Sequence, residues 1–447
     1  KGLPKGLKLD KKTGMISGVP SAAGSFEVVV SAPGVETETM ILTIEALPEW
    51  AMGRFSGWVN TEEHGPGLVE MDISSNGRIA GRYQFNGSSY RFKESSYFER
   101  ASDGSYRIHT EAGKGKESFS VSFSVYPPSE GGPALLSYVD GTLFSPYAGS
   151  AELFRRIWDD TGAETILEPY IGYYTAALPG GEGFGSGYLT FTIDEKGSVR
   201  TAGSLADGTK VSASGSLIYD PDGKTWIPLY CSPQSYEGGA LYGIIEFEKV
   251  GSTVVVKPLD DLDLLWQSYS ESATGSYGEG FYRLLGIEGG WYDQLVNLQN
   301  AYAEGLVVDD VELPIFIAKV KYPDGNRLEE VSGVSEASPE GLVLAASTKG
   351  LSAPKSDKVL KDKASSSYDF ATDTNQDGEI NTSALSFKVK SSTGIFSAKF
   401  NAWYSYDANR TSDKDAEKLK KQSLKVQGIL LPVQETPEES VVGSGYY

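Results

Sequence analysis

Short runs of alternating apolar and polar residues, each closed by a tight glycine turn, constrain the fold of this chain more than any other feature. A period of two places apolar side chains on one face of a β-strand. A glycine just after the run permits the positive φ angle of a hairpin turn. The clearest examples are residues 68–73 before Gly77, residues 189–193 before Gly197, and residues 385–389 before Gly394. The sequence therefore predicts an all-β protein built from antiparallel hairpins.

These hairpins belong to a longer repeat. Similar segments begin at Gly53, Gly172 and Gly290, so the period is 119 and then 118 residues. The turn glycine follows after 24 and 25 residues in the first two copies but after 104 residues in the third, which indicates a long insertion. Regular short strands with turn punctuation favour meander barrels or sandwiches. We expect three related antiparallel β-meander barrel or sandwich units, with a short helix over residues 413–421 in the third.

Composition excludes several classes of protein and partner. The chain has 447 residues and a net charge of −20, which disfavours nucleic acid and anionic membrane surfaces as partners. No apolar stretch approaches the 18 residues of a membrane-spanning helix, so we expect no membrane insertion. A single cysteine, Cys231, excludes an internal disulfide framework.

Residues 3–46 carry a dense motif of prolines, glycines and short strands. Its marked positions are Leu3-Pro4, Gly6-Leu7, Thr13-Gly14, Ile16-Ser17-Gly18, Pro20 and Ala23-Gly24. This motif closely resembles the signature of the Ig-like, cadherin-like modules of bacterial surface proteins, with Phe26 where tyrosine is common. The resemblance implies a spacer or adhesive stalk outside the cell. Strands that precede the motif in that family have no counterpart before Leu3, so we expect an incomplete Ig-like β-sandwich. Either the chain simply begins inside the module, or a neighbouring copy supplies the missing strand in a filament.

The expected organisation has four parts. They are an Ig-like β-sandwich at residues 1–47, β-repeat unit 1 at 48–165, unit 2 at 166–268 and unit 3, with insertions, at 269–447. This layout resembles the tandem β-repeat regions of large bacterial extracellular proteins.

One loop has the oxygen spacing of a calcium site. Its donors at loop positions 1, 3, 5, 7 and 9 are Asp373, Asn375, Asp377, Glu379 and Asn381. Gly378 at position 6 permits the sharp turn of such loops, but position 12 is Ala384 rather than an acid. The loop is either a structural calcium site or an Asp/Asn-rich turn without an ion.

Aromatic residues are dense around the second unit and the start of the third. The candidates for stacking on a sugar ring are Tyr173, Tyr174, Trp226, Trp291 and Tyr292. On alternating strands half of such side chains point inward, so the alternative is that they fill the cores of the units.

No assembled catalytic motif is present. His64 lies in a polar loop, His109 lies on an alternating strand, and Cys231 has no histidine partner in sequence. We therefore expect a non-catalytic structural or adhesive module of a bacterial secreted or cell-surface protein, located outside the cell. Its expected partners are other copies of itself, other surface proteins or glycans. The alternatives are an array of carbohydrate-binding modules and an accessory region of an extracellular polysaccharide hydrolase.

Overall fold

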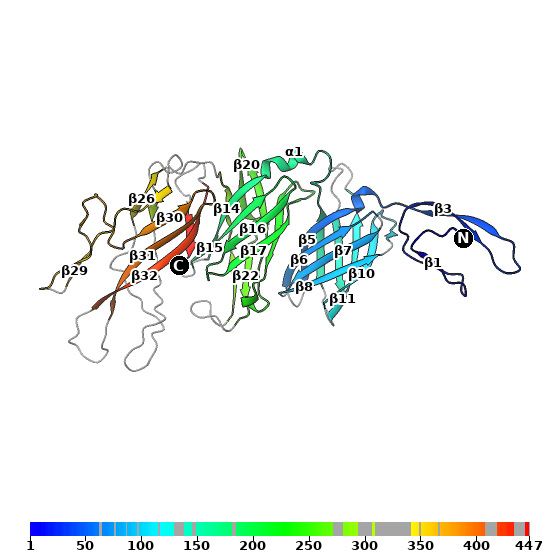
Figure 1. Cartoon of the computed structure of the whole chain (residues 1–447), viewed down its shortest axis with the longest axis horizontal. Helices are drawn as coiled ribbons and strands as arrows, with labels where there is room; N and C mark the ends of the chain where they lie inside the picture. Colours follow the sequence, from blue (N-terminus) through cyan, green and yellow to red (C-terminus); the bar gives the residue numbers. More distant parts are fainter. Residues whose placement is uncertain are drawn as a thin grey trace, which may run out of the picture. The chain divides into compact units, whose positions relative to one another are not determined.

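A computed structural model shows that the chain is an all-β protein of antiparallel sheets (Figure 1). The structure describes residues 1–61, 65–75, 77–85, 87–95, 98–114, 117–128, 138–144, 149–180, 185–270, 280–293, 306–308, 341–347, 350–364, 367–406, 418–432 and 443–446. Its helical elements in these ranges are η1 (Glu49–Ala51), α1 (Glu164–Leu167), η2 (Glu168–Tyr170), η3 (Gln234–Tyr236) and η4 (Leu259–Asp261). Among the described residues, no helix is long and apolar enough to cross a membrane.

The first 46 residues form two antiparallel hairpins. They are β1 (Leu7–Leu9) with β2 (Ile16–Gly18), and β3 (Gly24–Val30) with β4 (Glu38–Ile44). The Asp10 carboxylate holds the first turn by accepting hydrogen bonds from the backbone N–H groups of Lys12 and Thr13. Only Pro4 and Val28 are buried in this segment, so its hairpins have almost no core of their own.

The next strands form a nine-stranded sheet. They are β5 (Gly53–Thr61), β6 (Gly65–Ile73), β7 (Arg78–Phe85), β8 (Ser88–Ser95), β9 (Glu99–Arg100), β10 (Tyr106–Lys114), β11 (Glu117–Tyr126), β12 (Tyr138–Phe144) and β13 (Gly149–Arg155). Their order is β11-β12-β13-β5-β6-β7-β8-β10-β9, and β10 also pairs with β11. The hydrogen-bonded path therefore closes into a ring, as expected for a meander barrel.

Alternation along these strands divides the side chains between the inside of the ring and its outer face. The inward, fully or nearly buried residues include Phe55, Val69, Met71, Ile79, Tyr83, Phe92, Phe123 and Leu153. Their neighbours in sequence point outward because the side-chain period of a strand is two. The apolar core thus fixes which charged residues of β5–β8 share the outer face.

The second large sheet has eleven strands. They are β14 (Gly172–Pro179), β15 (Ser186–Ile193), β16 (Ser198–Ser204), β17 (Lys210–Ser216), β18 (Ile218–Tyr219), β19 (Thr225–Cys231), β20 (Leu241–Val250), β21 (Thr253–Pro258), β22 (Leu264–Ser268), β23 (Phe281–Leu285) and β24 (Glu288–Trp291). The main path runs β17-β16-β15-β14-β24-β21-β20-β19-β18, with β22 and β23 off it.

Smaller sheets follow. Their strands are β25 (Leu306–Val308), β26 (Leu342–Ser347), β27 (Gly350–Ser352), β28 (Leu360–Lys361), β29 (Tyr368–Asp369), β30 (Ser386–Lys390), β31 (Ile395–Tyr406), β32 (Lys418–Leu430) and β33 (Gly443–Tyr446). Buried side chains from several of them form one cluster, which includes Leu344, Leu385, Phe400 and Leu430.

Internal contacts divide the chain into two compact units. The first comprises Lys1–Ile171, Ile193–Val199 and Ala213–Phe247. The second comprises Gly172–Thr192, Arg200–Ser212 and Glu248–Tyr447. The predicted boundaries at residues 47, 165 and 268 and the predicted repeat relationship stay predictions.

The predicted turn glycines adopt the expected backbone conformation. Gly77 and Gly197 have φ angles of +74° and +66°. Each donates its N–H to the carbonyl three residues earlier, over 3.0 Å to Ser74 and 2.9 Å to Asp194. Both residues thus close hairpin turns of the same kind.

The predicted helix over residues 413–421 is wrong where the structure describes it. Residues 413–417 lie outside the described ranges, and residues 418–421 belong to strand β32, which pairs with β31 over residues 418–429. Pairing in a sheet overrides the helical propensity of a lysine-rich segment.

Candidate functional site

The outer face of strands β5–β8 carries two rows of polar residues. In the first row, Ser56 lies opposite Glu70, Glu70 lies opposite Arg82, and Arg82 lies opposite Arg91. In the second row, Arg54 lies opposite Asp72 and Asp72 lies opposite Ala80. Four neighbouring strands therefore present three arginines and two carboxylates on one surface.

The two carboxylates neutralise two of these arginines. Arg82 forms a hydrogen-bonded ion pair with Glu70, and Arg54 Nε lies 3.5 Å from an Asp72 carboxylate oxygen. Both pairs are at least partly exposed, so each contributes little to stability. Arg91 forms no ion pair with any side chain that the structure describes. It faces Arg82 across the strands, and such a like-charge pair is unfavourable unless something else compensates it.

Arg156 adds a fourth arginine from the segment after β13. Its backbone N–H donates to Arg54 O over 2.6 Å, which fixes the residue beside β5. Its Nη2 donates to the Lys196 carbonyl over 2.5 Å, and its side chain is only 10% exposed. Its Nε is buried without a hydrogen-bond partner, 3.6 Å from an Asp159 carboxylate oxygen. A buried donor without a hydrogen-bond partner costs free energy, and the nearby Asp159 carboxylate offsets part of that cost by its opposite charge.

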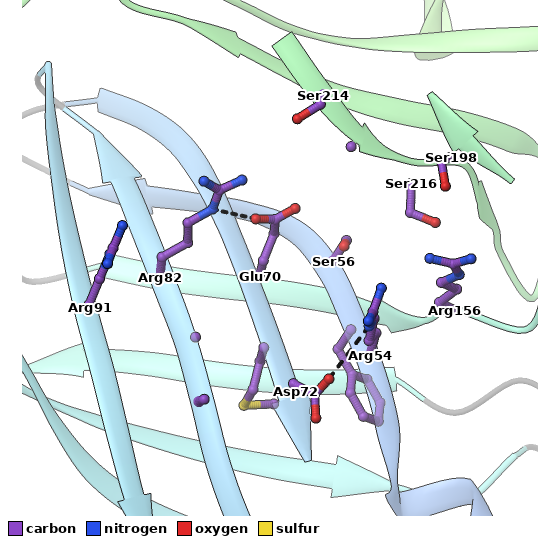
Figure 2. A pocket seen from close by; sticks show the side chains of 15 residues that line it. Arg54, Ser56, Glu70, Asp72, Arg82, Arg91, Arg156, Ser198, Ser214 and Ser216 are labelled. Carbon is purple, nitrogen blue, oxygen red and sulfur yellow. Dashed lines mark hydrogen bonds and ion pairs between the residues drawn. The ribbon is translucent and has the colours of Figure 1, made fainter. Parts of the chain in front are cut away.

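These residues line an open cleft of about 590 Å³ in the first compact unit. Ser198 from β16 and Ser214 and Ser216 from β17 complete the lining, and Figure 2 shows them facing the arginine-bearing strands. Four arginines against two carboxylates give the lining a net charge of +2, in a chain of net charge −20. The cleft is thus a local cationic surface with hydroxyl groups on its rim.

The five predicted sugar-stacking aromatics do not gather on one surface. Tyr174 and Trp226 are almost completely buried. The Trp226 ring packs 5.3 Å from the rings of Trp58 and Phe154, and its Nε1 donates to Asp220 over 2.8 Å. Trp226 is therefore part of a core that attaches β19 to β5 and β13.

Tyr173 and Tyr292 pack edge to face, with ring centroids 6.0 Å apart. Their hydroxyls donate to the carbonyls of Thr393 and Ser391, over 3.0 and 2.8 Å. Burial raises the pKa of Tyr173 to about 12, so its hydroxyl stays a donor at neutral pH. Trp291, at 40% exposure, is the exposed member of the predicted set.

The predicted calcium loop forms a compact turn. The Asp373 carboxylate accepts from the backbone N–H groups of Gln376 and Gly378, and Asn375 Oδ1 accepts from Asp377 N–H. Glu379 is exposed. Among the described residues, no three His, Cys, Asp or Glu side chains gather into a metal-binding group.

Asn381, at the end of the same loop, has different surroundings from the first three donors. It is completely buried, its Oδ1 accepts from Leu385 N–H, and its amide donates to Pro354 and Leu385 carbonyls. These bonds do not fit a role as a metal ligand.

A residue that the sequence did not single out, Asp357, organises the same loop. Its side chain is 7% exposed and accepts hydrogen bonds from the backbone of Thr374, Asn375 and Asn381. Burial alone would raise the pKa of this carboxyl, but the hydrogen bonds from these groups outweigh burial and lower the pKa below its ordinary value. Asp357 is thus an anchor of the loop.

The structure describes the other sequence candidates only in part. His64 lies outside the described residues, and His109 lies in β10 opposite Ser122. Burial raises the pKa of the Cys231 thiol to about 12, so the thiol is protonated and unreactive at neutral pH.

The sequence did not reveal the arginine cleft. The available signal was that Glu70 and Asp72 alternate with apolar residues in the predicted strand at residues 68–73. Only the pairing register shows that these acids and the arginines of the cleft are neighbours.

Comparison with known proteins identifies a family for the first segment of the chain alone. A family model described as a Putative Ig domain matches residues 1–45. Comparison with curated proteins and with solved structures gave no match. Residues 1–45 are therefore an Ig-like module, and this match does not extend to the larger sheets.

Proposed function

We propose that this chain is a non-catalytic structural or adhesive part of a bacterial secreted or cell-surface protein. In this proposal it works outside the cell, and its partners are further copies of itself, other surface proteins or glycans. The observation that carries the proposal is the Ig-like module at residues 1–45, because such a module suits a spacer or adhesive role. Antiparallel sheets throughout the described residues are consistent with a stalk of β-modules.

Exposed apolar residues on the Ig-like hairpins support contact with other proteins. Leu9, Met15, Met40 and Ile41 are 46%, 60%, 45% and 72% exposed. Exposed apolar side chains favour association when another surface covers them.

Immunolabelling of intact and lysed bacterial cells tests the location. Antibodies raised against the purified chain should label intact cells, and protease added outside should remove the label. Labelling only after lysis would overturn the proposal. Particles coated with the chain should also adhere to cells or matrix more strongly than particles coated with an unrelated acidic protein.

We also propose a structural calcium ion at the turn of Asp373, Asn375 and Asp377. A carboxylate has about four lone pairs, so acceptance of backbone N–H bonds leaves oxygens able to bind a hard cation. Calcium should slow proteolysis within residues 371–384 and leave the rest of the chain unchanged, whereas Asp373→Ala should remove the effect. Equal cleavage rates with calcium and with chelator would contradict this site.

A further inference from the structure

We propose that the arginine cleft on the outer face of β5–β8 binds acidic polysaccharide, through a carboxylate or sulfate group on a hydroxyl-rich chain. Naming a glycan as the ligand rests on the proposed extracellular role, whereas anion binding by the cleft rests on its geometry alone.

The arginines supply the anion site. Arg91 has no ion pair among the described side chains and lies directly opposite Arg82. Glu70 already balances the charge of Arg82, so an oxyanion beside both residues would supply the counter-charge that Arg91 lacks. The guanidinium fork matches the geometry of a carboxylate or sulfate. Arg156 adds a further positive charge to the lining, where its Nη2 is held by the Lys196 carbonyl.

The other lining residues select for hydroxyl groups. Ser198, Ser214 and Ser216 both donate and accept hydrogen bonds, and the carboxylates of Glu70 and Asp72 accept them. A sugar hydroxyl can donate a hydrogen bond to a carboxylate or serine oxygen and accept one from a serine hydroxyl. A ligand with one anionic group per sugar residue therefore places its charge beside Arg82 and Arg91 while its hydroxyls meet the serines and acids.

The same lining disfavours other polyanions. Duplex DNA carries a charge about every 1.7 Å along its axis, so phosphates would fall beside Glu70 and Asp72 as well as beside the arginines. Protein interfaces need buried aromatic or aliphatic anchors. The large apolar residues of the lining, Phe55 and Met71, are 0% and 2% exposed and cannot provide them.

Calorimetric titration of the purified chain tests the inference. The probes are an oligogalacturonate, a chondroitin sulfate oligosaccharide and a neutral maltooligosaccharide, all of similar length. We expect saturable binding of at least one acidic probe and none of the neutral probe. The pair of acidic probes shows whether a carboxylate or a sulfate is preferred.

Variants locate the binding to the cleft. Arg91→Gln should weaken the affinity for the acidic probe about fivefold, and Arg82→Gln with Arg91→Gln about twentyfold or more, because each removes a charge-assisted hydrogen bond. Arg91→Lys keeps the charge without the fork and should weaken it about twofold. Arg107→Gln makes the same charge change at an exposed site of β10 outside the lining, and should leave the affinity within about twofold.

Three results would overturn the inference. They are the absence of binding to both acidic probes, an affinity that the double variant leaves unchanged, and equal or tighter binding of polyglutamate or duplex DNA. Circular dichroism of each variant shows that a lost affinity does not reflect unfolding. An intracellular location of the parent protein would overturn the proposed function while leaving oligosaccharide binding intact, so the two failures are distinguishable.

Discussion

At the scale of single residues, Gly18 is required because the backbone of Gly6 occupies the place where a side chain would lie. A Cβ atom at Gly18 would lie 2.2 Å from the carbonyl oxygen of Gly6, and one at Gly6 would lie 2.0 Å from that of Val19. Both positions also have positive φ angles, which L-residues rarely adopt. The motif glycines at positions 6 and 18 therefore hold β1 against β2 at a distance that no other residue allows.

Gly18→Ala should consequently open the β1–β2 hairpin. Gly14 is the matched control, because it has a φ angle of +74° but no atom within 4 Å of its added Cβ. We expect Gly14→Ala to cost about 1 kcal/mol from backbone strain, and Gly18→Ala to cost about 2–3 kcal/mol more from the overlap. Hydrogen exchange of residues 7–18 measures the opening. Equal exchange rates in the two variants would contradict a steric role for this glycine.

Asp357 shows how one carboxylate can organise a loop. Its pKa is lowered from the ordinary value of 3.8, so the folded loop favours the ionised form. A folded-state pKa below the unfolded one stabilises the fold above that ordinary value, and this contribution is lost as pH falls through the folded-state pKa. The described loop should therefore loosen below about pH 4.

The variant Asp357→Asn should lose about 2 kcal/mol of stability at pH 7, because several N–H donors face a neutral amide instead of a carboxylate. The pH dependence of this loop below about pH 4 should then become weaker. Asp369→Asn is the control for burial, since the exposed Asp369 carboxylate at the end of β29 also accepts hydrogen bonds, from Ala371 N–H and the Thr372 hydroxyl. Thermal melts at pH 3 and pH 7 make the comparison, and an unchanged melt of Asp357→Asn at pH 7 would show that the hydrogen bonds are dispensable.

At the scale of elements, Trp226 tests whether the predicted aromatics are core or ligand surface. The residue is 1% exposed and packs with Trp58 and Phe154, so it holds β19 against β5 and β13. Trp226→Ala should destabilise the protein by about 3–5 kcal/mol. The same change at Trp291, which is 40% exposed, should cost less than half as much. Urea denaturation gives both values, and a small loss for Trp226→Ala would argue against its place in the core.

The strands themselves were largely predictable from sequence. Alternation predicted strands at residues 68–73, 189–193 and 385–389, and these lie within or overlap β6, β15 and β30. The helix predicted over residues 413–421 was wrong at residues 418–421 because local propensity does not include pairing with a distant strand. Such pairing brings Lys421 opposite Trp403.

The candidate site was not predictable for a related reason. Arg54, Arg82 and Arg91 look like separate solvated charges in the sequence, and Arg156 is far away along the chain. Their proximity follows from the register of four strands and from the hydrogen bond between Arg156 N and Arg54 O. The motif of the Ig-like module, by contrast, depends on local turns, so its sequence was sufficient to identify it.

At the scale of the whole molecule, the cationic cleft must attract an anion against a net charge of −20. Salt screens two interactions of the anion: its attraction to the nearby arginines and its repulsion by carboxylates far from the cleft. The Debye length is about 30 Å at 0.01 M ionic strength, about 10 Å at 0.1 M and about 3 Å at 1 M. At the lowest salt an approaching anion therefore senses carboxylates far from the cleft, whereas at 0.1 M it senses mainly the arginines nearby.

The affinity for an acidic oligosaccharide should consequently pass through a maximum as salt increases. We expect it to rise between about 0.01 and 0.1 M NaCl, as the distant repulsion is screened, and to fall several-fold by 1 M, as the arginine contacts are screened. Arg91→Gln should lower the affinity near the maximum. It should also make the loss of affinity towards 1 M NaCl smaller, because less local attraction remains to be screened. Titrations at five salt concentrations give the curve. A steady decline from 0.01 M, as in a basic polyanion-binding protein, would show that the acidic remainder of the molecule does not influence the cleft.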